Sequence, residues 1–340
     1  MAASISPERM LEYSGDTLRD VSIAFIVLVT LAVALRFVAL RLSEKPLSID
    51  DILTIPGYLC SVGLCILSLV SIDIGRVGYH LDVVEVIDPQ ALVPWAKCLY
   101  ATPIIYSAGC CFPRVVLLTL YLRICEKNRR YRLACYSLMA FIVVFAIADI
   151  MAGAFECWPV AYLWDKTIVG GKCDNIPMFY RWGTLPNVII DVAMLILPQP
   201  VVWKLQVPAQ VKYGLAVTFL TGSIGMVTSI CRCVAFFTNN PLTDGTWLSV
   251  TFLVWSVAEV GVYLIAACLP CYRPLLRLAI NRGRMTSIRS RYVHQKPRRS
   301  SAGRITATPE PDVEMSPYLK AKADQCRESD EQVLVMKGSG

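Results

Sequence analysis

The sequence predicts an all-α fold, a bundle of seven transmembrane helices, and two observations support this prediction. The first is a set of seven hydrophobic stretches, each long enough for the ~20 residues that a helix needs to cross a bilayer. The second is the composition, with 55% hydrophobic and 17% charged residues, against about 25% charged residues in soluble domains. We therefore expect the protein to lie in a lipid bilayer, which is its first predicted partner. In chain order, the stretches are 21–42, 51–74, 91–124, 133–155, 182–203, 213–238 and 247–270.

The distribution of positive charge predicts how this bundle is oriented. With successive connections assigned to alternate sides, one side carries fifteen Lys and Arg residues, including those of segment 123–132, and the other carries seven. Because Lys and Arg are retained on the cytoplasmic side of a membrane, we expect the short segment 1–20 outside and the C-terminus in the cytoplasm. The net charge of +7 then reflects membrane topology, and nucleic acid is not an expected partner.

The helices of the predicted membrane domain, residues 21–272, differ in their proline content. A proline removes a backbone donor and tends to kink a helix. Spans two, three and five are expected to be kinked, which is compatible both with a bundle that moves or encloses cavities and with a static one. The residues concerned are Pro56, Pro103, Pro113, Pro186, Pro198 and Pro200.

The C-terminal region is predicted to consist of two parts. Residues 273–305 form an amphipathic and basic juxtamembrane segment, and its first part, 274–280, is expected to lie on the inner leaflet as a short amphipathic helix. Residues 306–340 have no periodic pattern and are expected to form a disordered cytoplasmic tail. Ser300 and Ser301 follow two arginines and are candidate phosphorylation sites.

Charged residues inside the spans are the strongest candidates for a functional site. An unpaired charge at the bilayer centre costs ~2.5–3.5 kcal/mol on insertion scales, so such residues tend to pair. Arg114, Asp191 and Glu259 fall near the middle of spans three, five and seven, and we predict that they form an intramembrane polar cluster. Asp149 and Arg232 fall in the outer halves of spans four and six and are predicted to form an outer charge pair. The cluster either holds the bundle together or is a polar core that a ligand or a conformational switch disturbs.

Two cysteines in the connection between spans four and five are candidates for a disulfide bond. Cys157 and Cys173 both lie on the predicted external side, where an oxidising compartment permits such a bond. Cys98, near the outer end of span three, is a rival partner for either of them.

Several stretches, in order along residues 20–280, together resemble one family. They include the pair Asp50-Asp51, Gly75 to His80, Cys157-Trp158-Pro159, Asn187 with Asp191, Arg232, and the run from Trp255 through Glu259 to Leu275. This set resembles the fungal rhodopsin-like family of seven-helix integral membrane proteins, which is also named after a satratoxin-cluster protein and includes Pth-type candidate G-protein-coupled receptors. One departure is Arg114, where the family usually has a Lys.

The resemblance implies receptor-like sensing or signalling in a fungus, with an unknown small-molecule or surface ligand and a heterotrimeric G protein as candidate partner. It points to Arg123, Lys127, Arg129 and Arg130 as cytoplasmic coupling residues. The plasma membrane is the favoured location, and an internal membrane is the alternative.

Two other classes of function stay open. One is a non-catalytic accessory or transport protein linked to a secondary-metabolite biosynthesis cluster. The other is a membrane enzyme, which is disfavoured because the sequence contains no metal motif, activated nucleophile or paired-acid motif. No cofactor is expected, since span seven has no Lys to hold retinal as a Schiff base.

Overall fold

A computed structural model describes residues 7–42, 48–124, 129–174, 176–199, 209–238 and 244–272. All of them belong to one structural unit, Met1–Arg284. The predicted amphipathic segment, the predicted tail, Lys127, Ser300 and Ser301 lie outside the described residues.

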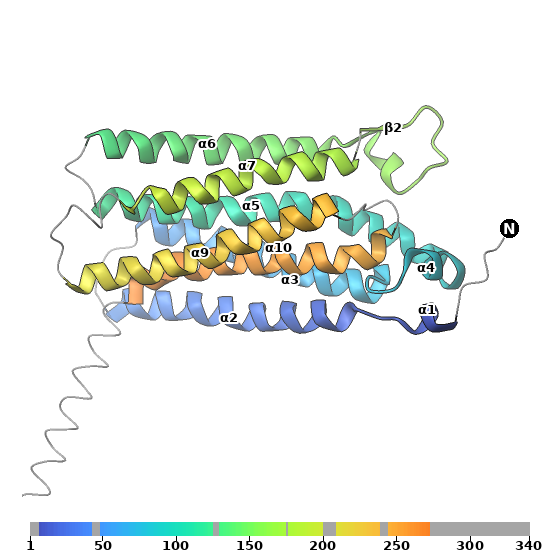
Figure 1. Ribbon diagram of the computed structural model, residues 1–340, viewed down its shortest axis with the longest axis horizontal. Helices are drawn as coiled ribbons and strands as arrows, with labels where there is room; N and C mark the ends of the chain where they lie inside the picture. The colour runs from blue at the N-terminus through green and yellow to red at the C-terminus, as the bar shows by residue number, and fades with distance from the viewer. Residues whose placement is uncertain are drawn as a thin grey trace, which may run out of the picture. The chain divides into compact units, whose positions relative to one another are not determined.

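Long helices dominate the described part of the chain (Figure 1). They are α2 (Gly15–Leu42), α3 (Ile49–Gly75), α5 (Leu92–Ile124), α6 (Arg129–Ala154), α7 (Ile176–Ile196), α9 (Ala209–Thr238) and α10 (Gly245–Cys268). Shorter elements are α1 (Pro7–Leu11), α4 (Leu81–Ile87) and the 3-10 turns η1 (Pro89–Ala91), η2 (Val160–Leu163) and η3 (Leu269–Tyr272). Strands β1 (Cys157–Trp158) and β2 (Lys172–Cys173) pair antiparallel.

The long helices run side by side, and α10 occupies the most central position among them (Figure 1). Helix α10 packs against α2, α3, α5 and α9, while α6 packs mainly against α5. Most residues of α10 are buried, including Glu259 and Leu264 with no exposed surface. Buried residues of α5 and α10 therefore provide much of the core, and α6 lies at the periphery.

Six helical segments meet the length and hydropathy of a membrane span, which confirms the predicted membrane class. They are Glu8–Leu42, Ile49–Gly75, Pro89–Arg123, Arg129–Ala154, Phe219–Thr238 and Gly245–Tyr272. Helix α7 has 21 residues, but Arg181, Asn187 and Asp191 lower its hydropathy, and it is not among them. The seventh span and the orientation of the termini stay predictions.

Two helices, α2 and α7, differ most from their expected boundaries. Helix α2 begins at Gly15, six residues before the predicted start, and Asp16 in its first turn interacts favourably with the helix dipole. Helix α7 covers Ile176–Ile196 rather than 182–203. Its earlier end has a clear cause, since Pro198 cannot donate the backbone hydrogen bond that another turn requires.

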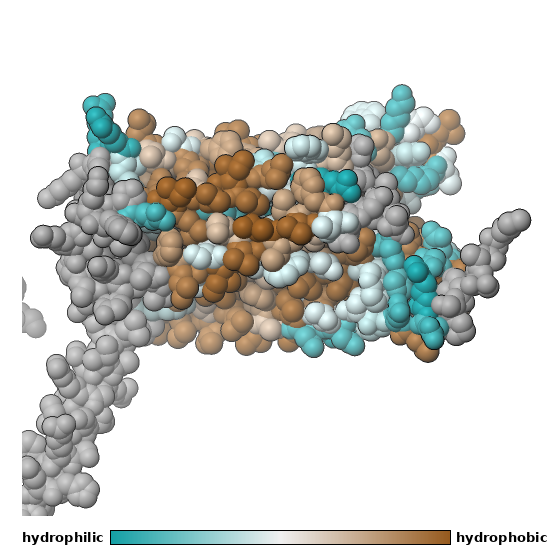
Figure 2. Space-filling view, in the orientation of Figure 1, coloured by the Kyte–Doolittle hydropathy of each residue, from teal (hydrophilic) through white to brown (hydrophobic). Residues whose placement is uncertain are grey.

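An apolar surface surrounds the bundle. On the face shown in Figure 2, hydrophobic residues cover the middle of the helices, and hydrophilic residues gather toward their ends. The exposed side chains include Val27 and Leu31 on α2, Ile66 on α3 and Val144 on α6. A soluble protein rarely exposes so large an apolar surface, so this band is the part that lies in the bilayer.

The end of the bundle that carries β1 and β2, here called the disulfide end, is held by backbone contacts around Gly78. The Ser14 amide donates to the Gly78 carbonyl over 3.0 Å, and the Gly78 amide donates to the Thr246 carbonyl over 3.3 Å. Gly78 has a φ of +110°, and a Cβ there would lie 2.6 Å from the Gly15 nitrogen. Only glycine fits at a backbone position so close to another chain segment.

Candidate functional site

A buried network of charges joins α5, α7, α9 and α10. Arg114 Nη2 lies 2.8 Å from Asp191 Oδ1 and 3.2 Å from Glu259 Oε1. The three side chains are at most 2% exposed. The structure therefore brings together the three residues that the sequence predicts as the intramembrane polar cluster. Arg114 Nη1 also donates to Asn187 Oδ1 over 2.8 Å.

Arg232 belongs to the same network, which corrects the predicted outer pair. Its Nε donates to Glu259 Oε2 over 3.0 Å, and its Nη2 donates to the hydroxyl of Tyr106. Asp149 instead accepts from Ser107 Oγ at 2.5 Å, and among the described residues no ion pair joins it to Arg232. The prediction of a direct Asp149–Arg232 pair was wrong because Glu259 offers Arg232 a fully buried carboxylate. We call Arg114, Asp191, Arg232 and Glu259 the central charge cluster.

Neutral side chains complete the central charge cluster, and sequence reasoning did not assign them to it. Tyr106 donates to Glu259 Oε1 over 2.8 Å, and the ring of Tyr263 lies 4.9 Å from the Arg114 guanidinium carbon.

Helical spacing is the sequence signal that could have identified these neutral residues, because residues three, four or eight apart share a helix face. The pairs with this spacing are Tyr106 and Arg114, Asn187 and Asp191, Ser229 and Arg232, and Glu259 and Tyr263.

Ser229 lies between the two carboxylates of the cluster. Its Oγ is 2.5 Å from Asp191 Oδ2 and 2.6 Å from Glu259 Oε1. A hydroxyl has a single hydrogen to donate, so it can donate to only one carboxylate at a time. The other contact is a hydrogen bond only if that carboxyl carries a proton and donates it to Ser229. The protonation of Asp191 and Glu259 thus decides which of the two contacts of Ser229 is a hydrogen bond.

A cavity of about 320 Å³ lies between the central charge cluster and the disulfide end. Tyr106, Asn187 and Arg232 belong both to the network and to the cavity lining. Most of the remaining lining is apolar or aromatic and comes mainly from α5, α9 and α10, including Trp95, Phe236 and Phe252. Ligand sites typically combine such an apolar wall with a few fixed polar groups.

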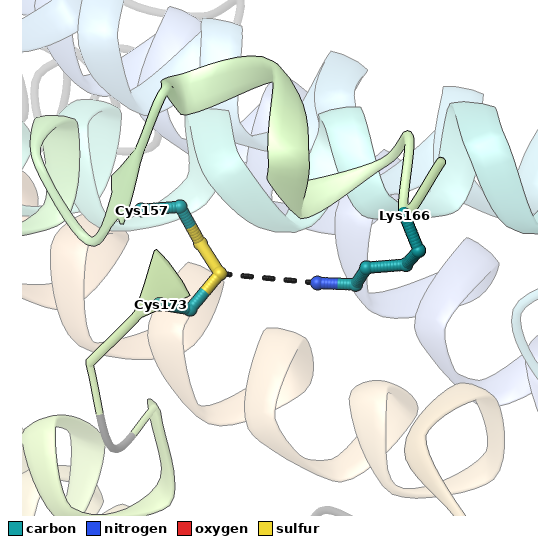
Figure 3. The surroundings of a disulfide bond; sticks show 3 residues. All are labelled: Cys157, Lys166 and Cys173. Atoms are coloured by element: carbon teal, nitrogen blue, oxygen red, sulfur yellow. Dashed lines mark hydrogen bonds between the residues drawn. A yellow bond between two sulfur atoms is a disulfide. The ribbon is translucent and has the colours of Figure 1, made fainter. Parts of the chain in front are cut away.

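The connection between α6 and α7 borders this cavity and is closed by the predicted disulfide bond. Cys157 and Cys173 are bonded, whereas Cys98 is a free, buried thiol. Figure 3 shows the Lys166 side chain extending toward Cys173, with its Nζ 3.8 Å from the Cys173 sulfur. Lys166 and Leu163 from this connection both line the cavity.

Glu156, next to the disulfide, is a buried carboxyl group outside the cavity lining. Its side chain Oε1 has no hydrogen-bond partner in the described structure. Burial, together with the nearby charge of Asp174, raises the pKa of Glu156 to about 7. The stability of the folded connection therefore falls as pH rises from the ordinary carboxyl pKa of 4.5 to about 7, where Glu156 ionises in the folded state, and changes little above that.

His80 is a structural residue of the disulfide end. It is 8% exposed, accepts or donates hydrogen bonds at Asp244 and Glu12, and stacks on Trp247 with ring centroids 4.1 Å apart. Burial lowers the pKa of His80, but the hydrogen bonds to Asp244 and Glu12 outweigh burial and raise it above its ordinary value.

The opposite end of the bundle contains a second set of ion pairs, which sequence reasoning missed. Buried Arg36 binds Asp51 Oδ1 over 2.8 Å and donates to the Ala267 carbonyl over 2.8 Å. The capping box of α3 uses the same Asp51, whose Oδ2 accepts from the Ser48 amide over 3.0 Å. These bonds join the ends of α2, α3 and α10.

Three of the four predicted coupling residues, Arg123, Arg129 and Arg130, lie at this opposite end. Arg123, with a side chain 55% exposed, binds Asp50 Oδ2 over 2.9 Å and Ser48 Oγ over 2.5 Å. Arg129 and Arg130 are exposed at the start of α6. Arg123 thus links the end of α5 to the start of α3. It forms no ion pair with the central charge cluster among the described residues. Within the described ranges, no group of His, Cys, Asp or Glu side chains is arranged to hold a metal ion.

The helical bundle, its apolar band and its buried charge cluster define a polytopic membrane protein. A fungal rhodopsin domain model matches residues 35–278, and the chain therefore belongs to the fungal rhodopsin family. This result confirms the resemblance seen in the sequence. No solved structure matches the chain.

Related proteins occur in several fungi. The polyenoic acids biosynthesis gene cluster protein Ba17b of Metarhizium anisopliae is 31% identical over 275 residues, covering 78% of this chain and 75% of that protein. A SAT4 family membrane protein of Emericella nidulans is 29% identical over 209 residues, covering 61% and 53%. The satratoxin biosynthesis SC1 cluster protein 4 of Stachybotrys chartarum is 23% identical over 172 residues, covering 51% and 62%.

Proposed function

We propose that this protein is a receptor-like sensor in a fungal membrane, in which a small ligand occupies the cavity and changes how the helices pack. One observation carries the proposal: Tyr106, Asn187 and Arg232 line the cavity and also bond within the buried network. A ligand that contacts these three side chains competes with or reinforces bonds between α5, α7, α9 and α10.

The central charge cluster suits such a switch because its ion pairs are strong only when the helices hold each charge beside its partner. Charges in a low-dielectric interior are stabilised when each has a partner, and removing a partner is costly. Small displacements of a helix therefore favour a small number of discrete packings over a continuous range. A ligand shifts the balance between these packings by the difference between its affinities for them.

Signal output is proposed for the opposite end of the bundle. Arg123 is half exposed and binds Asp50 at the start of α3, so a movement of α5 relative to α3 would release its guanidinium for a partner. A heterotrimeric G protein is the proposed partner, with Arg129 and Arg130 on α6 as further contacts. The plasma membrane is the proposed location of this activity.

Co-precipitation of G-protein α subunits from native membranes tests the proposal. We expect the wild type to capture an α subunit, Arg123→Ala to lose most of the capture, and Arg41→Ala, an exposed change at the end of α2, to retain it. Absence of capture by folded and membrane-inserted wild type would contradict coupling to a G protein.

A second candidate is a non-catalytic accessory or transport protein of a secondary-metabolite cluster. The names of the polyenoic acids and satratoxin relatives favour it, and it would also suit an internal membrane. Disruption of the gene would then change how a metabolite is divided between cells and medium, with no change in G-protein signalling. Neither candidate function requires a cofactor or a catalytic step.

A further inference from the structure

Asp149 is a carboxylate on α6 that forms no ion pair in the described structure, although the charge of Arg232 attracts it from beyond ion-pair distance. It lies within the span Arg129–Ala154, where an isolated charge is unfavourable. Buried charges of other helices are paired, since Arg36 binds Asp51 and the central charge cluster contains two arginines and two acids. Among the described residues, Asp149 accepts a hydrogen bond at Oδ2 from the Ser107 hydroxyl.

The free side of Asp149 faces the cavity that it lines. Its Oδ1 lies 3.7 Å from the position that a Cβ would take at Gly183 on α7. Because Gly183 has no side chain and also lines the cavity, space is left open beside this oxygen. The same cavity exposes the aromatic side chains of Trp95 and Phe236.

Two cations also line the cavity, and both have other partners. Arg232 is bonded to Glu259 and Tyr106. Lys166 points its Nζ toward Cys173 and lies 4.5 Å from the ring centroid of Tyr162. Asp149 is the one acidic side chain among the described lining residues, and no ion pair joins it to another described residue.

We propose that the cavity binds a lipophilic amine, whose protonated nitrogen pairs with Asp149 while its apolar part lies against the aromatic wall. This proposal rests on the proposed function, because it names the ligand class of the same cavity. A cation neutralises the lone carboxylate, and aromatic faces attract ammonium groups as well as apolar ones. An acidic ligand would meet the negative charge of Asp149, and a neutral one would leave that charge without a partner.

Three probes of similar shape separate charge from hydrophobicity: 2-(1-naphthyl)ethylamine, 2-(1-naphthyl)ethanol and 1-naphthylacetic acid. Their dissociation constants are measured at pH 7 by equilibrium dialysis against the full chain in lipid nanodiscs. We expect the wild type to bind the amine at least ten-fold more tightly than the alcohol or the acid. Asp149→Asn should lower the affinity for the amine to that for the alcohol, and should leave the affinity for the alcohol unchanged.

Two further variants control for general damage to the protein. Asp149→Glu keeps the negative charge and should keep a preference for the amine. Glu156→Gln removes a carboxyl group that does not line the cavity, and should leave all three affinities unchanged. If Asp149→Asn fails to fold, the Asp149→Glu and wild-type comparison still tests the amine preference.

The outcomes separate the two proposals. Equal binding of the three probes, or tighter binding of the acid, overturns the amine proposal and leaves a ligand-binding cavity. An amine preference that persists in folded Asp149→Asn also overturns it. Failure of the folded wild type to bind any of the probes overturns both the amine proposal and the cavity as a ligand site.

Discussion

Glu259 is the residue on which the central charge cluster depends most, because it binds both arginines. Its Oε1 lies 3.2 Å from Arg114 Nη2, and its Oε2 accepts from Arg232 over 3.0 Å. Replacing it with glutamine leaves two buried guanidinium groups with one carboxylate between them. We expect Glu259→Gln to lower the free energy of unfolding by ~3–5 kcal/mol, measured by chemical denaturation in micelles. Glu85→Gln, an exposed change on α4, should have little effect.

A charge swap gives a sharper test of the same arrangement. In an isolated pair, Arg114→Glu combined with Glu259→Arg would restore the attraction. Here the new arginine would lie beside Arg232 and the new glutamate beside Asp191, so two like-charge contacts replace favourable ones. We expect the double variant to be no more stable than the weaker single variant. Recovery of wild-type stability would contradict the four-charge network.

His80 predicts a pH dependence at the disulfide end. Its pKa is raised in the folded state above the ordinary value of 6.5, so its contribution to stability is complete below about pH 6.5 and is lost as pH rises through the folded pKa. The thermal midpoint of the wild type should therefore fall more steeply between pH 6 and pH 8.5 (about the range in which histidine titrates) than that of His80→Gln. Parallel curves would show that the Glu12 and Asp244 contacts do not depend on the charge of His80.

At the level of helices, the two acids at the start of α3 have different roles although they are adjacent. Asp51 binds Arg36, whose side chain is 2% exposed, whereas Asp50 binds Arg123, whose side chain is 55% exposed. We expect Asp51→Asn to cost ~3–5 kcal/mol because it leaves a buried arginine without its partner. Asp50→Asn should cost about 0–1 kcal/mol, because the guanidinium group that loses its partner is exposed to water. Equal losses in denaturation experiments would contradict this distinction.

The disulfide bond restrains the connection between α6 and α7. It joins residues separated by 16 positions, for which the chain-entropy model gives ~3 kcal/mol of stabilisation. Replacing both Cys157 and Cys173 by serine should lower the free energy of unfolding by about this amount. A reductant should lower the stability of the wild type in the same way and have no further effect on the double variant. Because Leu163 and Lys166 border the cavity, the affinity of a cavity ligand should fall as well.

For the whole molecule, the distribution of Lys and Arg predicts an external N-terminus. A tag at each terminus tests this in sealed protoplasts treated with protease. We expect loss of the N-terminal tag and retention of the C-terminal tag, with loss of both after permeabilisation. Protection of the N-terminal tag in sealed cells would reverse the orientation and place Arg123 on the external side, which would also contradict its role in coupling.

The sequence by itself determined the membrane class and six of the spans. It predicted the Cys157–Cys173 disulfide, with Cys98 as a rival partner, and the cluster of Arg114 with Asp191 and Glu259. These features follow from local properties: hydrophobic length, and the high cost of a charge in the bilayer, which limits the choice of partners. The family resemblance, too, is contained in short motifs.

Only the tertiary structure decided which partner each remaining charge has. Arg232 binds Glu259 and not Asp149, Arg36 binds Asp51, and His80 is buried against Trp247. Depth along a helix can be read from the sequence, but the rotation of each helix and the identity of its neighbours cannot. Ion pairing depends on depth, on helix rotation and on the neighbouring helices, because a buried charge interacts strongly only with groups within a few ångströms.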